Sequence, residues 1–121
     1  MDKNLKGLKP ALVWKHFAEI CNIPHPSHHE DAIRAYIVKW AEELGLEHKI
    51  DEAQNVYVYK PATPGMENRK GIILQAHTDM VPQKNNDKVF NFETDPSGAY
   101  IDGEWVTASG TTLGADNGIG L

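Results

Sequence analysis

Two residues of this chain, His77 and Asp79, have the types and the spacing of a metal ligand and its supporting carboxylate. They directly follow an apolar, β-favouring run, residues 71–76. Along an extended chain, residues i and i+2 point to the same side, so both side chains can face one site. A neutral imidazole is a common metal ligand, and a nearby carboxylate fixes its orientation. A hydrogen-bonded histidine and a turn-capping aspartate give the same pattern without a metal.

A glycine-rich segment, residues 110–120, strengthens the metal hypothesis because it contains a further candidate ligand, Asp116. Its glycines allow the backbone to turn sharply and to approach a site closely. A carboxylate such as Asp116 can bridge two divalent ions about 3.5–4 Å apart, and the two ions together activate one water. The sequence Asp116-Asn117-Gly118 also suits an ordinary tight turn, so this segment has an interpretation without chemistry.

Composition narrows the class of protein. The chain has 121 residues, 40% of them hydrophobic, and a formal net charge of -5, which fits one globular domain and argues against a nucleic-acid partner. No apolar run approaches the roughly 20 residues that a membrane span needs, and the charged N-terminus lacks the apolar core of a signal peptide. The single cysteine, Cys21, excludes an internal disulfide and is expected to be buried in a helix. Together these features favour a cytoplasmic protein.

Two helices are expected in the first part of the chain. The spacing of Leu12, Val13, Phe17 and Ile20 predicts a helix from Pro10 to Cys21. The prolines of segment 23–27 cannot continue it. Ser27 and Glu30 have the spacing of a capping box, which predicts a second helix ending near Leu44, before Gly45.

After Gly45 the pattern becomes that of strands and loops. Strands are expected at residues 47–51, 55–60 and 71–76, a hairpin around Asp102-Gly103, and a helix from about Asn117 to Leu121. The continuous apolar run 71–76 is typical of a strand covered on both faces. We therefore expect an α/β fold, with helices flanking a mixed, largely parallel sheet and the site at the carboxyl end of a central strand.

The two candidate segments also carry a family resemblance. Gln75-Ala76-His77-Thr78-Asp79-Met80-Val81-Pro82-Gln83-Lys84-Asn85 and Thr111-Thr112-Leu113-Gly114-Ala115-Asp116-Asn117-Gly118-Ile119-Gly120 closely resemble the aminoacyl-histidine dipeptidases, or bacterial carnosinases. These belong to the dinuclear zinc exopeptidases and deacylases. Ile23-Pro24-His25-Pro26-Ser27 resembles the N-terminal Ile-Pro-x-Pro-Ser turn of the same family.

The resemblance implies roles for the three candidates. His77 would bind one metal, Asp79 would support that histidine as a catalytic carboxylate, and Asp116 would bridge two divalent ions through a segment whose Asp116-Asn117 peptide bond is cis. Zinc is the expected metal, and manganese and cobalt accept the same ligands. The implied substrate is a dipeptide of the Xaa-His type. Another dinuclear exopeptidase or an N-acyl amino acid deacylase remains an alternative, and so does a non-catalytic, oligomerising fragment.

The family's adjacent glutamates, its general base and a further ligand, follow the bridging aspartate and are not found in these 121 residues. Glu42-Glu43 precedes His77 and is interpreted as a solvated helix face. We expect the chain to be the N-terminal part of a metallopeptidase catalytic domain, inactive by itself and able to self-associate through an exposed edge. His28 and His29 are expected to be exposed first-turn residues, His16, His25 and His48 surface residues, and the tryptophans packing residues.

Overall fold

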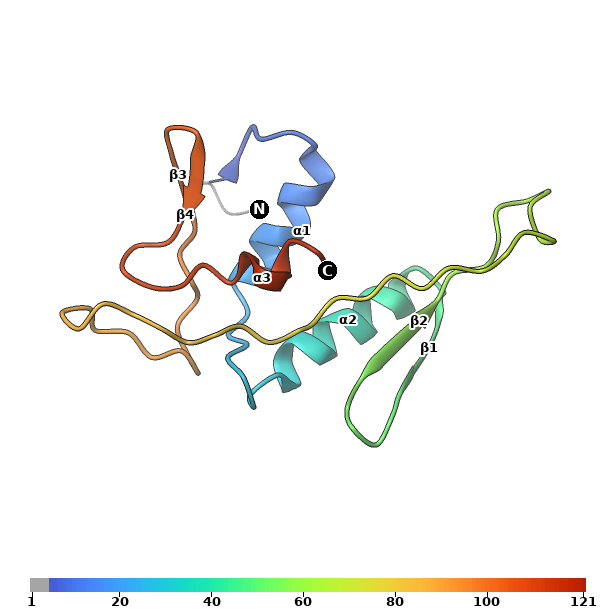
Figure 1. Cartoon of the computed structure of the whole chain (residues 1–121), viewed down its shortest axis with the longest axis horizontal. Helices are drawn as coiled ribbons and strands as arrows, with labels where there is room; N and C mark the ends of the chain where they lie inside the picture. The colour runs from blue at the N-terminus through green and yellow to red at the C-terminus, as the bar shows by residue number, and fades with distance from the viewer. Residues whose placement is uncertain (1–4) are drawn as a thin grey trace. The chain divides into compact units, whose positions relative to one another are not determined.

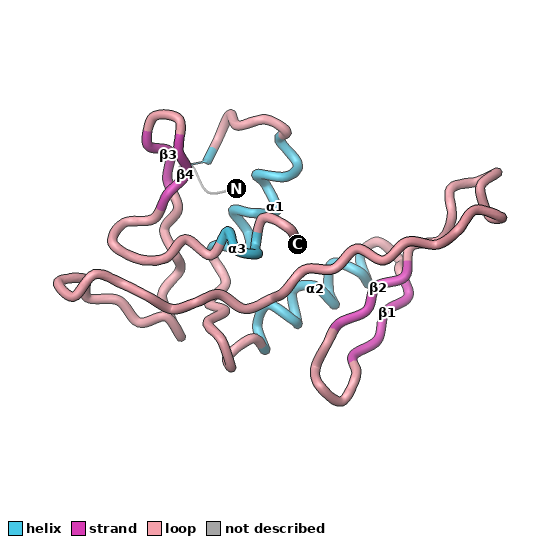
Figure 2. Tube along the Cα trace, viewed as in Figure 1, coloured by secondary structure: helices cyan, strands magenta, loops and turns pink. Residues whose placement is uncertain are grey.

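The computed structural model describes residues 5–121, so the first four residues of the charged N-terminus lie outside the described part. The chain divides into two compact units (Figure 1). One unit combines the chain up to Ile33 with Ala76–Leu121, and the other is Arg34–Gln75. Figure 2 shows that most of the described chain is loop. None of the helices in residues 5–121 is both long and apolar enough to cross a membrane.

Helix α1, Ala11–Cys21, carries the core of the first unit. Pro10 precedes it, a position where its missing N–H costs no helical hydrogen bond. The inward face packs into a cluster of buried residues: Leu5, Phe17, Ala18, Cys21 and Ala99. The predicted burial of Cys21 is confirmed. The expected apolar stripe is only half buried, because Leu12 is 64% exposed.

The last part of the chain supplies a hairpin and a short helix to the same unit. Strands β3, Tyr100–Asp102, and β4, Trp105–Thr107, pair antiparallel, as predicted. Trp105 is 76% exposed, so the expectation that it is a packing residue is wrong. The expected helix near Asn117 is the four-residue α3, Ala115–Gly118. It lies against α1, where Gly118 packs close to Phe17 and Ile20 (Figure 1).

Helix α2, Asp31–Glu43, continues into the second unit and is followed by an antiparallel pair of strands. Gly45, with φ +67°, ends this helical region in a conformation that favours glycine. The two predicted strands, β1, Glu47–Ile50, and β2, Val56–Tyr59, then pair antiparallel as a hairpin. The backbone N–H of Asn55 donates to the Asp51 carboxylate at 2.8 Å, which closes the turn between the strands.

The expected parallel sheet is not found in residues 5–121, which form two separate two-stranded antiparallel sheets. Residues 71–76 are not a strand, because a strand needs a hydrogen-bonding neighbour and this part of the chain provides none. Ile72, Ile73 and Leu74 are 83%, 94% and 89% exposed, so the prediction that both faces are covered is wrong for the described chain.

The core of α1 gives a test of this packing. Replacing Phe17, which is 2% exposed, with Ala removes a ring from the buried cluster. We expect the free energy of unfolding to fall by about 3 kcal/mol. Leu12→Ala in the same helix is the matched control and should cost less than about 1 kcal/mol. Urea denaturation followed by circular dichroism measures both, and equal losses would contradict the assignment of the inward face.

Candidate metal centre

The site begins with a turn, residues 23–27, that holds the segment just after Asp79. The backbone N–H of Met80 donates to the His25 carbonyl at 3.0 Å, and that of Ser27 donates to the Met80 carbonyl at 3.1 Å. Pro26 and Met80 thereby form a parallel bridge. The two prolines restrict the backbone of this turn. The turn therefore holds Met80, the residue that directly follows Asp79, in a defined position.

A second tie joins the same segment to the residues that precede Asp116. The Thr112 hydroxyl donates to the Val81 carbonyl at 2.6 Å, and the Thr112 N–H donates to the Gln83 carbonyl at 2.8 Å. Residues far apart in sequence are thus connected by backbone and side-chain hydrogen bonds. This connection brings the segment that precedes Asp116 next to the segment that follows Asp79.

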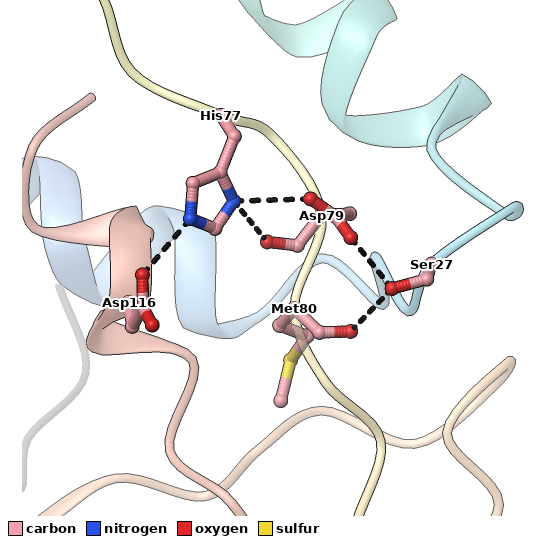
Figure 3. A network of polar contacts seen from close by, with 5 residues as sticks. All are labelled: Ser27, His77, Asp79, Met80 and Asp116. Atoms are coloured by element: carbon pink, nitrogen blue, oxygen red, sulfur yellow. Dashed lines mark hydrogen bonds and ion pairs between the residues drawn. The ribbon is translucent and has the colours of Figure 1, made fainter.

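The three predicted site residues converge at this place (Figure 3). His77 Nε2 lies 2.9 Å from Asp116 Oδ1. His77 Nδ1 lies 3.0 Å from Asp79 Oδ1 and 3.0 Å from the Asp79 carbonyl. The peptide bond between Asp116 and Asn117 is cis, as the resemblance implied. The site is open to solvent, with 95% of the Asp116 side chain and 51% of the His77 side chain exposed.

Two carboxylates on one imidazole favour its protonated form, since only the cation carries an N–H on both ring nitrogens. The hydrogen bond to Asp116 is the main cause that raises the pKa of His77, and the contacts with Asp79 act in the same direction. The pKa of Asp79 is lowered, chiefly by the hydrogen bond from Ser27 and further by His77. The proton between Nε2 and Asp116 occupies the place where a metal ion would compete for both atoms.

Ser27 is the site residue that the sequence did not predict. Its hydroxyl donates to Asp79 Oδ2 at 2.5 Å and lies 3.3 Å from the Met80 carbonyl (Figure 3). The expected capping box with Glu30 is wrong, because α2 begins at Asp31. The Ile-Pro-x-Pro-Ser pattern was the available signal, but nothing in the spacing connects Ser27 with a carboxylate 52 residues away.

The donor set fits one side of a metal site. A nitrogen and a carboxylate oxygen, each a usual zinc ligand, face one another, and Asp79 holds the opposite ring nitrogen, as supporting carboxylates do in metal sites. Residues 5–121 contain no group of three or more His, Cys, Asp or Glu side chains that could hold a metal ion. The described residues therefore supply two donors and not a closed coordination shell.

The other histidines and the glutamate pair lie outside this site. His28 and His29 are exposed as expected, although both precede the helix, and His29 lies 3.3 Å from Glu93. The expectation that His25 lies on the surface is wrong, since only 2% of it is exposed. His16 and His48 are partly exposed, each beside a glutamate. Glu42 and Glu43 are exposed, as predicted.

Comparison with known proteins finds similarity to dipeptidases, in agreement with the resemblance seen in the motifs. It is 60% identical over 117 residues, 97% of its length, to a cytosol non-specific dipeptidase of Escherichia coli (strain K12). It superposes with TM-score 0.93 and 60% identity on the crystal structure of an aminoacylhistidine dipeptidase from Vibrio alginolyticus, over 98% of the chain. The chain spans 24% of the length of each. No family model matches it.

The raised pKa of His77 gives a prediction for the metal-free chain. An NMR pH titration should find it above the ordinary histidine value. Asp116→Asn removes the principal cause and should lower it, so His77 loses its proton at lower pH. Asp79→Asn should lower it less, because the Asp79 carbonyl remains beside Nδ1. An unchanged pKa of His77 in Asp116→Asn would contradict the hydrogen bond between His77 and Asp116. His29, which does not belong to this site, serves as the internal reference.

Proposed function

We propose that this chain is the N-terminal part of the catalytic domain of a metallodipeptidase that hydrolyses Xaa-His dipeptides of the carnosine type. The observation that carries the proposal is the convergence of His77 Nε2 and Asp116 Oδ1 at 2.9 Å, with Asp79 on the opposite ring nitrogen. Three residues chosen from two separate motifs meet in one place. An ordinary turn at Asp116 and an ordinary strand-end histidine would have no reason to do so.

His77 and Asp116 would hold divalent metal, zinc in the first place and manganese or cobalt as alternatives. A dinuclear centre supplies a water nucleophile near neutral pH and polarises the scissile carbonyl. Asp79 would keep the proton of His77 on Nδ1, which leaves the Nε2 lone pair directed at the metal. Ser27 would keep Asp79 ionised and oriented, because its hydroxyl donates to the carboxylate.

The choice of Xaa-His dipeptides rests on the resemblance of the Met80–Asn85 segment to the aminoacyl-histidine branch. The similar protein from Vibrio alginolyticus has the same specificity in its name, while the relative from Escherichia coli is called non-specific. A broader dipeptidase, another dinuclear exopeptidase or a deacylase is the second candidate. The cytoplasm is the proposed location, in keeping with the word cytosol in the name of that relative.

Because the described residues offer two metal donors, we propose that the chain by itself is inactive. The exposed run Ile72-Ile73-Leu74 has unpaired backbone and apolar side chains, which favours association, with another part of a longer protein or with a second copy. A non-catalytic, self-associating fragment would share this run. Sedimentation that shows a strict monomer would oppose self-association, and carnosine hydrolysis by the chain with added zinc would contradict inactivity.

Zinc titration tests the metal site directly. We expect weak binding of a single ion, because only two donors converge, and the resonances of the His77 ring should shift on titration. Asp116→Asn should weaken the binding further, since an amide is a poorer zinc ligand than a carboxylate. His29→Asn is the matched control and should leave it unchanged. Calorimetry that finds tight binding of two ions would refute the two-donor site.

A chimera tests the catalytic roles. The 117 matched residues of the Escherichia coli dipeptidase would be replaced by those of this chain. We expect the chimera to hydrolyse dipeptides, with His77→Ala or Asp116→Ala reducing activity to background and Asp79→Asn reducing it about 10- to 100-fold. His16→Ala should keep full activity. Preference for Xaa-His over other dipeptides in a substrate panel separates the two specificities, and an active His77→Ala chimera would contradict the proposed site.

A further inference from the structure

The His25 side chain is buried beside the candidate metal centre and has an unusual hydrogen-bonding state. Only 2% of the residue is exposed, and Nδ1 lies 2.6 Å from the Ile23 carbonyl. A carbonyl can only accept, so Nδ1 carries a proton, and in the neutral ring Nε2 is then an acceptor. Within residues 5–121, this Nε2 is buried and has no hydrogen-bond partner.

A buried acceptor without a partner is rare in folded proteins, because it loses its hydrogen bond to water and gains nothing in return. A buried acceptor of this kind generally has a donor, either an ordered water or a neighbouring backbone N–H. The Ile23 contact prevents the ring from turning over to use its other nitrogen. His25 Nε2 is therefore a fixed acceptor that requires a donor.

The same nitrogen lies next to Gly114, in the turn that leads to Asp116. A Cβ added to Gly114 would lie 3.5 Å from His25 Nε2 and 3.0 Å from Met80 Sδ. Gly114 has φ +86°, a conformation that favours glycine, and its carbonyl accepts from the Gly118 N–H at 3.0 Å. The side chains of His25 and Met80 thus lie against Gly114, two residues before Asp116.

His25 also belongs to the turn that orients the other carboxylate. Its carbonyl accepts from the Met80 N–H at 3.0 Å, and Ser27, two residues on, donates to Asp79. One buried residue is therefore part of both supports of the site. Its ring lies next to Gly114, in the turn that leads to Asp116, and its backbone carbonyl belongs to the turn that holds Asp79.

We propose that His25 is a positioning residue for the metal centre, whose Nε2 accepts a hydrogen bond that holds the Gly114–Asp116 turn in place. The inference rests on the proposed metal-binding function of His77 and Asp116. The donor is a water or a backbone N–H of residues 115–117, two sources of the same chemistry. His25 does not bind the metal or the substrate, and it acts through Asp116.

Two substitutions of His25 distinguish the roles of its two ring nitrogens. His25→Asn keeps a donor for the Ile23 carbonyl and removes Nε2, while His25→Gln places an amide acceptor near the position of Nε2. We expect His25→Asn to shift the amide NMR signals of residues 114–118 and to weaken zinc binding at His77 about tenfold. His25→Gln should restore most of both. His29→Asn, an exposed histidine in the same unit, should change neither.

The two donors give different NMR signatures in the unsubstituted chain. A backbone donor predicts slow hydrogen exchange at one amide of residues 115–117, lost in His25→Asn, whereas a water predicts a water cross-peak to the His25 ring. The proposal would be overturned if His25→Asn gave the same amide signals and zinc affinity as His29→Asn. It would also be overturned if His25→Gln did not differ from His25→Asn. If His77 in the unsubstituted chain does not respond to zinc, the metal function fails, while the amide signals still test the role of His25.

Discussion

The candidate site depends on one imidazole held between two carboxylates. His77 meets Asp116 through Nε2 and Asp79 through Nδ1, at 2.9 and 3.0 Å. A neutral ring has one N–H and can donate to only one of them, so the second carboxylate requires a proton or a metal ion on the other nitrogen. The two are alternatives at the same place. The geometry that raises the pKa of His77 is therefore also the geometry that would present Nε2 to an ion in the proposed metal centre.

The electrostatics of this arrangement come from close contacts more than from burial. The Asp116 side chain is 95% exposed, and water screens its charge strongly, so a long-range field contributes little. The raised pKa of His77 comes chiefly from the short hydrogen bond between its ring and the Asp116 carboxylate. Two buried side chains lie next to the glycines on either side of Asp116: His25 next to Gly114, and Phe17 next to Gly118. The exposed Asp116 side chain is thus flanked by backbone that packs against buried groups.

Local patterns in the sequence were enough for α1, for the hairpin of β3 and β4 and for β1 and β2 as separate strands, because each depends on neighbours a few positions away. The roles of the three site residues stay predictions. The prediction of a strand at residues 71–76 was wrong for the described chain, since a strand is defined by a partner whose position in the sequence is not fixed by local pattern. His25 and Ser27 were misread for the same reason. Their partners, Gly114 and Asp79, are more than 50 residues away, and no period or spacing connects them.

The separation between His77 and Asp116 shows how such long-range order is achieved without a sheet. These residues are 39 positions apart, yet the segment after Asp79 is tied on one side to the 23–27 turn and on the other to Thr112. Each tie consists of a few hydrogen bonds next to a stiff or glycine-dependent turn. Thr112 is four residues from Asp116, so little free chain would remain to be ordered if an ion bound at the proposed site. Most of the entropy that would oppose such binding would then be lost during folding.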